Sequence, residues 1–191
     1  MRSATLLLVA TLALAGPATA GDPYADTIEL FKNSGQSAEF FDNSYGYAVF
    51  PTVGKAGFVV GGAHGKGQVY EQGEYVGDAK VSKLSVGLQA GGQAYSQIVF
   101  FQDKRAFDEF TSGNFEFGAG VNAVAITASA GAEAGTAGTS AGMSGGKKDA
   151  KTVGKYHKGM AVFTIVKGGA MYEASLAGQK YDYTPRSKSK T

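Results

Sequence analysis

Glycine recurs at nearly every second residue between Gly57 and Gly67, and this spacing limits what the chain can fold into more than any other feature. Side chains of a β-strand point alternately to its two faces, so one face of this stretch is made of glycine and small apolar residues. Its members are Gly57, Val59, Gly61, Ala63, Gly65 and Gly67. Because glycine loses more conformational entropy on folding than other residues do, strong sheet curvature or a closely packed second segment must compensate.

The surrounding stretch, Tyr45–Tyr70, predicts a β-hairpin. Its first strand is the apolar run Tyr47–Phe50, which Pro51 ends or confines to a sheet edge because proline has no N–H for the hydrogen-bond ladder. Residues Val53–Ala56 are expected to turn the chain, and the glycine-rich strand follows them.

Three further segments have helical character. Apolar residues recur at helical spacing from Asp22 to Asp42 with a break at Gly35, which predicts two short helices. We expect these helices to cap one end of the sheet. Contact with a lipid surface is the alternative, and the lack of a lysine-rich polar face disfavours it. Asp103 is positioned to cap a third helix, which Gly113 ends.

The remaining segments alternate between polar and apolar residues or consist of small ones. Glu71–Lys83 is polar and is expected to be a connection, whereas Ser85–Phe101 predicts one long bent strand or two strands that meet at its paired glycines. Strand-like alternation resumes at Phe115–Thr127. Small side chains dominate residues 128–151, which favours strands ending in a mobile loop, and Lys158–Tyr183 is expected to contain the final strands.

Two short sequence blocks occur twice. GYAVFPTV at Gly46–Val53 is echoed by GMAVFTIV at Gly159–Val166, and GQVY at Gly67–Tyr70 is echoed by GQKY at Gly178–Tyr181. The blocks are either related hairpins of one sheet or a coincidence between apolar strands.

The first twenty residues have the three parts of a secretory signal peptide. Arg2 supplies a positive start, Leu6–Ala15 is an apolar core, and Ala18-Thr19-Ala20 is a small-residue cleavage site. We therefore expect residues 1–20 to be a signal peptide that is removed on export.

The rest of the chain is expected to be one domain, residues 21–183, followed by a basic disordered tail, residues 184–191. The sequence contains no cysteine, which excludes disulfides, thiolate metal sites and a lipid-bearing cysteine. The protein is therefore expected to be periplasmic or secreted, and not a lipoprotein.

No residue pattern typical of catalysis, metal binding or nucleotide binding stands out. The two histidines, His64 and His157, lie far apart and have no metal-ligand spacing. Gly61–Lys66 contains glycines and a lysine, but not at the spacing of a phosphate-binding loop. A net charge of +2 gives no reason to expect nucleic-acid binding. We therefore expect a protein that is not an enzyme and that has no catalytic residues, metal or cofactor.

Lysines gather beside the small-residue stretch and near the C-terminal end of the sequence. At about 1 kcal/mol per cation near an anionic membrane, four such charges supply roughly 4 kcal/mol, which corresponds to a millimolar dissociation constant. Charge alone therefore binds lipid weakly, and useful binding requires an apolar contact or a pocket as well.

Several motifs together resemble the SYLF-domain family in their order and spacing. They are GYAVFPTVGKAGFVVGGAHGKGQVY, SVGLQAGGQAYSQIVFF, DKRAFDEF, FEFGAGVNAVA and KGMAVFTIVKGGAMYEASLAGQKYDY. The resemblance implies a lipid-binding module: eukaryotic members bind phosphoinositides and some bind and bundle actin, whereas bacterial members are exported. It implies no enzyme activity and no cofactor.

These observations predict an α+β fold, in which a mainly antiparallel, strongly curved, glycine-rich sheet or partly closed barrel carries short flanking helices. The expected function is non-enzymatic binding of phospholipid, most simply an anionic one, at a membrane surface of the cell envelope. Candidate headgroup contacts are Lys55, Lys66, Lys83 and Lys104. The alternatives are a structural or protein-interaction module that receives a partner strand, and an enzyme whose acid and base groups only the fold brings together.

Overall fold

The computed structural model describes residues 21–57, 60–86, 93–118, 123–126, 156–168, 176 and 178–187. The predicted signal peptide, residues 128–151 and the paired glycines of Ser85–Phe101 lie outside this part of the chain.

The described residues form three short helices and eight strands, which curl into a half-barrel and confirm the expected α+β class. The helices are α1 (Pro23–Lys32), α2 (Ala38–Asn43) and α3 (Lys104–Phe110). The strands are β1 (Gly46–Gly57), β2 (Val60–Glu71), β3 (Glu74–Val86), β4 (Gln93–Phe101), β5 (Phe115–Glu116), β6 (Val124–Ile126), β7 (Met160–Gly168) and β8 (Gln179–Pro185).

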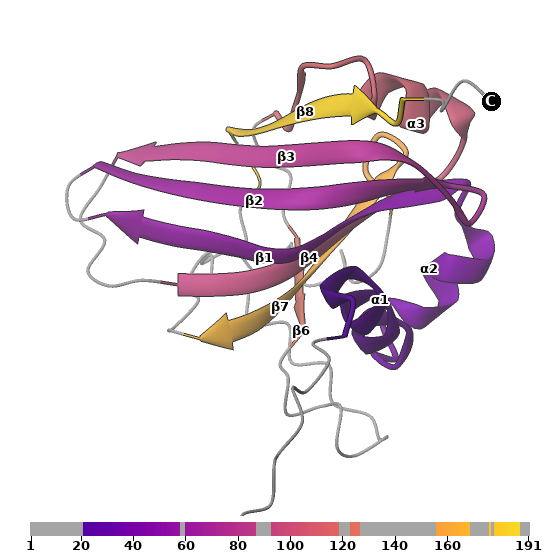
Figure 1. Cartoon of the computed structure of the whole chain (residues 1–191), viewed down its shortest axis with the longest axis horizontal. Coiled ribbons are helices and arrows are strands. Elements are labelled where there is room, and N and C mark those ends of the chain that lie inside the picture. The colour runs from indigo at the N-terminus through magenta and orange to yellow at the C-terminus, as the bar shows by residue number, and fades with distance from the viewer. Residues whose placement is uncertain are drawn as a thin grey trace, which may run out of the picture.

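All eight strands belong to one sheet, in the order β5-β8-β3-β2-β1-β4-β7-β6 (Figure 1). Neighbouring strands are antiparallel except β6 and β7, which are parallel. The curl brings distant strands together inside the sheet: Gln97 Nε2 of β4 donates to Gln179 Oε1 of β8 at 3.1 Å, although three strands separate β4 from β8 in the sheet order. Phe50 and Tyr181 also meet there, with ring centroids 5.6 Å apart.

Apolar side chains pack on both faces of this sheet. The inner core fills the half-barrel and includes Phe107 and Phe110 of α3. The outer core includes Phe31 of α1 and Phe40 of α2, which pack with residues of β1, β4 and β7. The two predicted N-terminal helices are therefore present and lie against the sheet. Because they cover its β1, β4 and β7 part, most of the outer face of β2, β3 and β8 has no helix of the described residues over it (Figure 1).

Strand β1 does not end at Pro51, so the predicted end of the first strand is wrong. β1 continues to Gly57, and the residues expected to turn the chain belong to it. The register of β1 shifts near Pro51 on both sides, against β2 and against β4. Ser96 Oγ of β4 donates to the Pro51 carbonyl at 2.8 Å, so an irregularity in the ladder accommodates the residue that lacks an N–H.

The glycine face of β2 points into the inner core, where neighbouring strands compensate for its missing side chains. A Cβ atom at Gly67 would lie 2.5 Å from Phe50 Cδ1. A Cβ atom at Gly65 would lie 2.8 Å from Val53 Cγ2 and 3.0 Å from Val81 Cγ1. The expectation that another segment packs closely against this strand is confirmed.

The prediction that Glu71–Lys83 is a polar connection is wrong. Most of this segment is β3, which follows β2 after a turn at Gln72 and Gly73, with φ of 50° and 87°. Positive φ at both central residues is typical of the turns that join two strands of a hairpin. The inward-facing residues of β3 begin with Gly77 and Ala79, which are too small to make the alternation obvious in the sequence.

Helix α3 forms as predicted. Asp103 accepts a hydrogen bond from the Ala106 N–H at 2.8 Å, and Gly113 follows the helix with φ of 108°. The C-terminal strand runs further than predicted, because Thr184 and Pro185 pair with β3 although they were assigned to the disordered tail. The Arg186 N–H then donates to the Val76 carbonyl at 2.8 Å.

The repeated sequence blocks all lie in one sheet, but the interpretation that they are two related hairpins is wrong, because β1 pairs with β2 whereas β3, β2, β1 and β4 separate β8 from β7. β1 and β7, which contain the first pair of blocks, lie on the two sides of β4. β2 and β8, which contain the second pair, lie on the two sides of β3.

Candidate functional site

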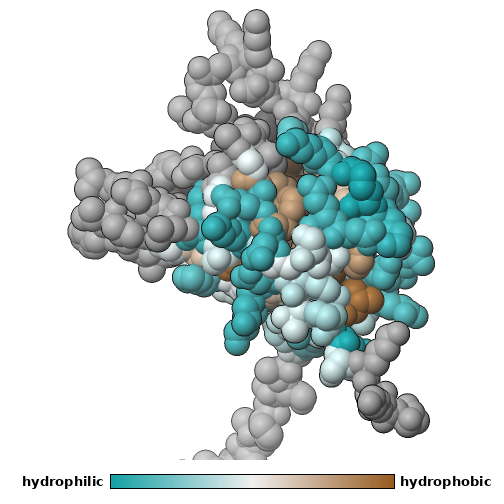
Figure 2. Space-filling view, turned by 90° about the horizontal axis from the view of Figure 1, so that it is seen from above, coloured by the Kyte–Doolittle hydropathy of each residue, from teal (hydrophilic) through white to brown (hydrophobic). Residues whose placement is uncertain are grey.

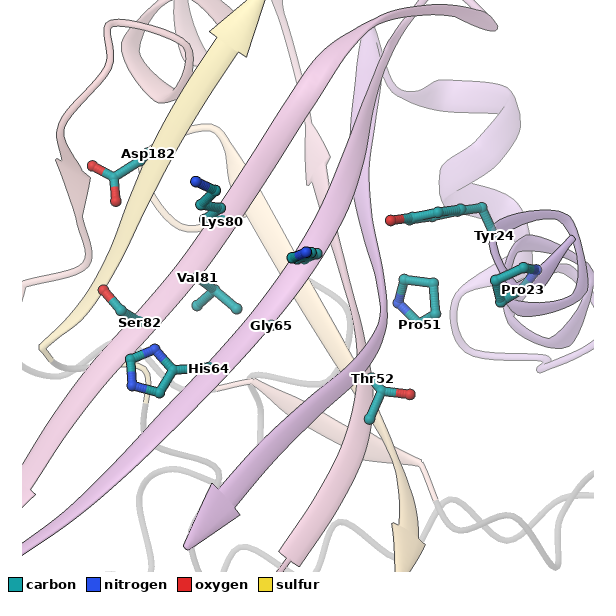
Figure 3. Close-up of a pocket in the computed structure, with 11 residues that line it drawn as sticks. Pro23, Tyr24, Pro51, Thr52, His64, Gly65, Lys80, Val81, Ser82 and Asp182 are labelled. Carbon is teal, nitrogen blue, oxygen red and sulfur yellow. The ribbon is translucent and has the colours of Figure 1, made fainter.

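A groove of about 740 Å³ lies on the outer face of the sheet (Figure 3). It runs beside the N-terminal end of α1, over the part of β2, β3 and β8 that α1 does not cover. Its lining comes from α1 and from four strands. The lining residues are Pro23, Tyr24, Pro51, Thr52, His64, Gly65, Lys66, Lys80, Val81, Ser82 and Asp182.

Two lysines lie directly opposite each other in this groove. Lys66 of β2 and Lys80 of β3 are Cα partners in the antiparallel register, and both are exposed. Like charges at such a position destabilise a sheet by roughly 0.2–1 kcal/mol. Among the described residues the side chain of neither lysine forms an ion pair or a hydrogen bond. On the next strand, β8, Asp182 is the Cα partner of Lys80. No ion pair joins the side chains of these two residues.

Polar side chains flank the lysine pair on neighbouring positions. His64 and Ser82 are Cα partners and form the next outward-facing row of β2 and β3. Thr52 of β1 is the Cα partner of Lys66, and its Oγ1 accepts a hydrogen bond from Lys167 Nζ of β7 at 3.3 Å. The groove therefore gathers ammonium, imidazole and hydroxyl groups, which can donate hydrogen bonds to an oxyanion.

The opposite wall is apolar and comes from α1 and β1. Figure 3 shows Tyr24 extending from α1 toward β2, beside Pro23 and Pro51. Asp22 caps α1 by accepting a hydrogen bond from the Tyr24 N–H at 3.0 Å, which helps to hold Tyr24 in place. Partial burial, and then the nearby carboxylates of Asp78 and Asp22, raise the pKa of Tyr24 above its ordinary value, so its phenol stays neutral at physiological pH.

The four lysines predicted from the sequence do not form one site. Lys66 lines the groove. Lys55 lies on β1 opposite Ala63 and Gln93. Lys83 is half-buried on β3 opposite Ala63, so it does not alternate with the outward-facing residues Lys80 and Ser82 that line the groove. Lys104 begins α3, where its Nζ lies 2.7 Å from Asp108 Oδ1 in an exposed ion pair that raises the pKa of the ammonium.

Sequence reasoning missed Lys80, which the structure places beside Lys66. Lys80 belongs to the segment that was taken for a polar connection. Recognising Gln72-Gly73 as a hairpin turn would have paired β2 with β3 and placed the two lysines together.

A second polar cluster lies in the inner core. Gln97 and Gln179 are fully buried or nearly so, and they form hydrogen bonds with Tyr95 and Tyr181 from β4 and β8. Burial raises the pKa of Tyr95 to about 12 and that of Tyr181 well above its ordinary value. Both phenols therefore remain protonated, and the cluster joins the two sides of the half-barrel.

The described surface offers small hydrophobic areas instead of a broad apolar face. Figure 2 shows mainly hydrophilic side chains on the face above β8 and α3, with hydrophobic residues between them. Within the described residues, the large hydrophobic side chain that remains exposed is Leu30, at 39%.

The described residues contain neither a cluster of metal ligands nor a membrane-spanning helix. No three His, Cys, Asp or Glu side chains within these residues are grouped so that they would hold a metal ion. Within the same residues, no helix has the length and apolar character needed to cross a bilayer.

Comparison with known proteins identifies the family. A family model described as Ysc84, Las17-binding protein actin regulator, matches residues 82–187, which is more than half of the chain. The chain belongs to this family. It is the SYLF family that the motifs of the sequence resemble.

A protein named Beta cell expansion factor A, from Aeromonas veronii, is 31% identical to the chain over 162 residues. The match covers 82% of this chain and 53% of that protein, so the chain spans about half the length of this relative. The SYLF family is one of lipid- or actin-binding modules and is not a known enzyme family.

Proposed function

We propose that this SYLF protein is a non-enzymatic module that binds anionic phospholipid at a membrane surface of the cell envelope. The lipid headgroup occupies the groove between α1 and the outer face of β2, β3 and β8. The observation that carries the proposal is the pair Lys66 and Lys80, two exposed and directly opposed cations whose ammonium groups form no ion pair among the described residues.

The groove supplies apolar contact in addition to positive charge. Two lysines near an anionic surface contribute about 2 kcal/mol, which is weaker than the roughly 4 kcal/mol of a millimolar complex. The apolar wall of Pro23, Tyr24 and Pro51 adds contact area for the glycerol backbone or the first carbons of an acyl chain. Binding is therefore expected to weaken in high salt without disappearing.

The site of action follows from the N-terminal segment. The predicted signal peptide directs the chain out of the cytoplasm, and the anionic headgroups available there belong to the membranes of the envelope. The mature protein is accordingly proposed to be periplasmic or secreted.

Co-flotation with liposomes tests the proposal. The processed chain, residues 21–191, is mixed with neutral or anionic vesicles at low and high salt, and the fraction that floats is measured. We expect flotation only with anionic vesicles, with a smaller fraction in high salt. The double variant Lys66→Ala/Lys80→Ala should lose most of this binding.

A matched variant controls for net charge. Lys32→Ala/Lys104→Ala also removes two positive charges, but neither lysine lines the groove and Lys104 is already paired with Asp108. It should float almost as well as the original chain. Equal loss in both double variants would show that general charge, and not the groove, causes the binding.

A protein-interaction function is the second candidate, and the edge of β8 favours it. β5 pairs only with Lys180 and Tyr181, so residues 182–185 have no strand on their outer edge within the described part of the chain. An extended partner segment could add there as a further strand. If the protein floats with no vesicle, cross-linking in intact envelopes followed by identification of the linked protein becomes the test of this function.

A further inference from the structure

We infer that the groove selects a phosphomonoester, a terminal phosphate group that carries two negative charges, over a phosphodiester that carries one. The inference rests on the proposed function in one respect, namely that the ligand occupies the groove between α1 and the sheet. It goes further by assigning the chemical group that the groove recognises.

The arrangement of cations is the first reason. Cβ atoms of directly opposed residues in an antiparallel pair lie roughly 5 Å apart, so the stems of Lys66 and Lys80 start side by side. In the free protein the two ammonium groups repel each other, and within the described residues no carboxylate pairs with either of them. Across the groove the ammonium groups of Lys167, Lys66 and Lys80 face one carboxylate, that of Asp182 opposite Lys80, so three positive charges and one negative charge leave +2. A dianion neutralises this charge, whereas a monoanion leaves one positive charge uncompensated.

The donors around this pair are the second reason. Lys167 reaches the groove from β7 and donates to Thr52 Oγ1, which brings a third ammonium group to the edge of the site. His64 and Ser82 lie on the next row of the same two strands. A phosphomonoester presents three terminal oxygens to such donors, and a phosphodiester presents only two.

The other groups of the groove suit the remainder of the ligand. Asp182 is exposed at the β8 side and accepts hydrogen bonds, so it favours a hydroxyl group and disfavours a second phosphate. Tyr24 and Pro51 offer an apolar surface to carbon atoms next to the ester oxygen. The same chemistry is found in a phosphatidic acid headgroup and in a small soluble phosphomonoester.

The experiment separates these two sources of the phosphate. In a soluble arm, methyl phosphate and dimethyl phosphate are titrated into the processed chain, and binding is followed by NMR shifts of the Lys66 and Lys80 amides. In a membrane arm, phosphatidic acid vesicles and phosphatidylglycerol vesicles are matched in zeta potential, and flotation is compared. We expect roughly tenfold tighter binding of the monoester in each arm.

Two variants link this preference to the lysine pair. Lys66→Ala/Lys80→Ala should bind monoester and diester equally weakly, and Lys66→Arg/Lys80→Arg should keep the preference because it keeps both charges. Both positions are exposed, and removing like charges does not unfold a sheet, so thermal unfolding should show that each variant remains folded.

The outcomes distinguish this inference from the proposed function. Equal binding of monoester and diester in both arms overturns the inference, even if anionic vesicles still float the protein. A monoester preference that survives in Lys66→Ala/Lys80→Ala also overturns it. Selective binding of methyl phosphate without any vesicle binding supports the inference with a soluble ligand, and it refutes the proposed lipid function.

Discussion

Replacing Gly67 by alanine tests how the glycine face of β2 is compensated. The added methyl group would lie 2.5 Å from Phe50 Cδ1, 2.6 Å from Phe50 Cε1 and 2.7 Å from the Val49 carbonyl oxygen. Ordinary contacts of such an atom begin near 3.4 Å, so Phe50 and the strand beside it must move by about 1 Å. Phe50 is fully buried against Tyr181 and has no open space to enter.

The expected magnitude follows from overpacking of a dense core. Extra methyl groups in such cores cost typically 1–3 kcal/mol, and the lower backbone entropy of alanine returns about 0.5 kcal/mol. We therefore expect Gly67→Ala to lower the free energy of unfolding by about 2 kcal/mol. For a domain of this size the midpoint of thermal unfolding should fall by roughly 4–8 °C.

Gly54→Ala is the matched control. Gly54 lies on β1 beside the same hairpin, but a Cβ atom there would meet no atom within 4 Å. This substitution should leave stability unchanged or raise it by about 0.5 kcal/mol, because alanine loses less entropy than glycine.

Urea unfolding followed by tyrosine fluorescence and by circular dichroism measures both variants. Equal slopes against urea concentration would show that the same surface is exposed on unfolding, so that midpoints compare stability directly. If Gly67→Ala were as stable as Gly54→Ala, the close approach of Phe50 would not be the reason for glycine at position 67. The claim that neighbouring side chains fill the space beside the glycine face of β2 would then be refuted.

Three further predictions concern charge, buried polar atoms and pH. Lys66→Glu replaces repulsion from Lys80 by attraction, and its partner on the other side is the uncharged Thr52, so the free energy of unfolding should rise by about 0.5–1 kcal/mol while vesicle flotation falls; a decrease in both would contradict the opposed-lysine arrangement. Thr164 Oγ1 is buried without a hydrogen-bond partner among the described residues, so Thr164→Val should stabilise the protein by about 1 kcal/mol in urea unfolding. Thr27→Val should destabilise it, because the Thr27 hydroxyl donates to a backbone carbonyl at 2.7 Å. Burial raises the pKa of Tyr95 from 10.0 to about 12, so the folded state holds this proton more tightly than the unfolded state does; stability should be complete below pH 10 and fall by about 2.7 kcal/mol as the pH rises to 12, and a flatter alkaline unfolding curve for Tyr95→Phe would check the assignment.

Local signals in the sequence predicted the elements that depend on local chemistry. Asp103 and Gly113 marked the ends of α3 correctly, because an N-cap carboxylate and a glycine with positive φ act on backbone groups only a few residues away. Strict alternation in the Ser85–Phe101 region likewise predicted strand β4, although the sequence did not show that both of its faces are buried.

Elements that depend on distant partners were missed or misplaced. β1 passes Pro51 because its register shifts there against both neighbouring strands, and Ser96 of β4 donates a hydrogen bond to the Pro51 carbonyl; nothing near Pro51 in the sequence predicts either feature. β3 was taken for a connection because Gly77 and Ala79 carry little apolar surface of their own. The large side chains that fill the space beside them, such as Tyr183 next to Gly77, come from β8.

The candidate site was predicted only in part for the same reason. Lys66 was named from the sequence as one cation among several, without any means of ranking it. Lys104 looked equivalent until the structure placed Asp108 Oδ1 2.7 Å from its ammonium group, so that a ligand there would also meet a carboxylate. Lys80 acquired its significance only from the register of β2 against β3.

The sequence by itself determined the family, the curved β-rich class and the positions where glycine is needed, because periodicity, caps and motifs are properties of neighbouring residues. The tertiary structure decided which glycine lies under which aromatic ring, which lysines oppose each other and which are neutralised. Those properties depend on strand register and on contacts between residues far apart in the chain, where a shift of one position moves every side chain to the other face of the sheet.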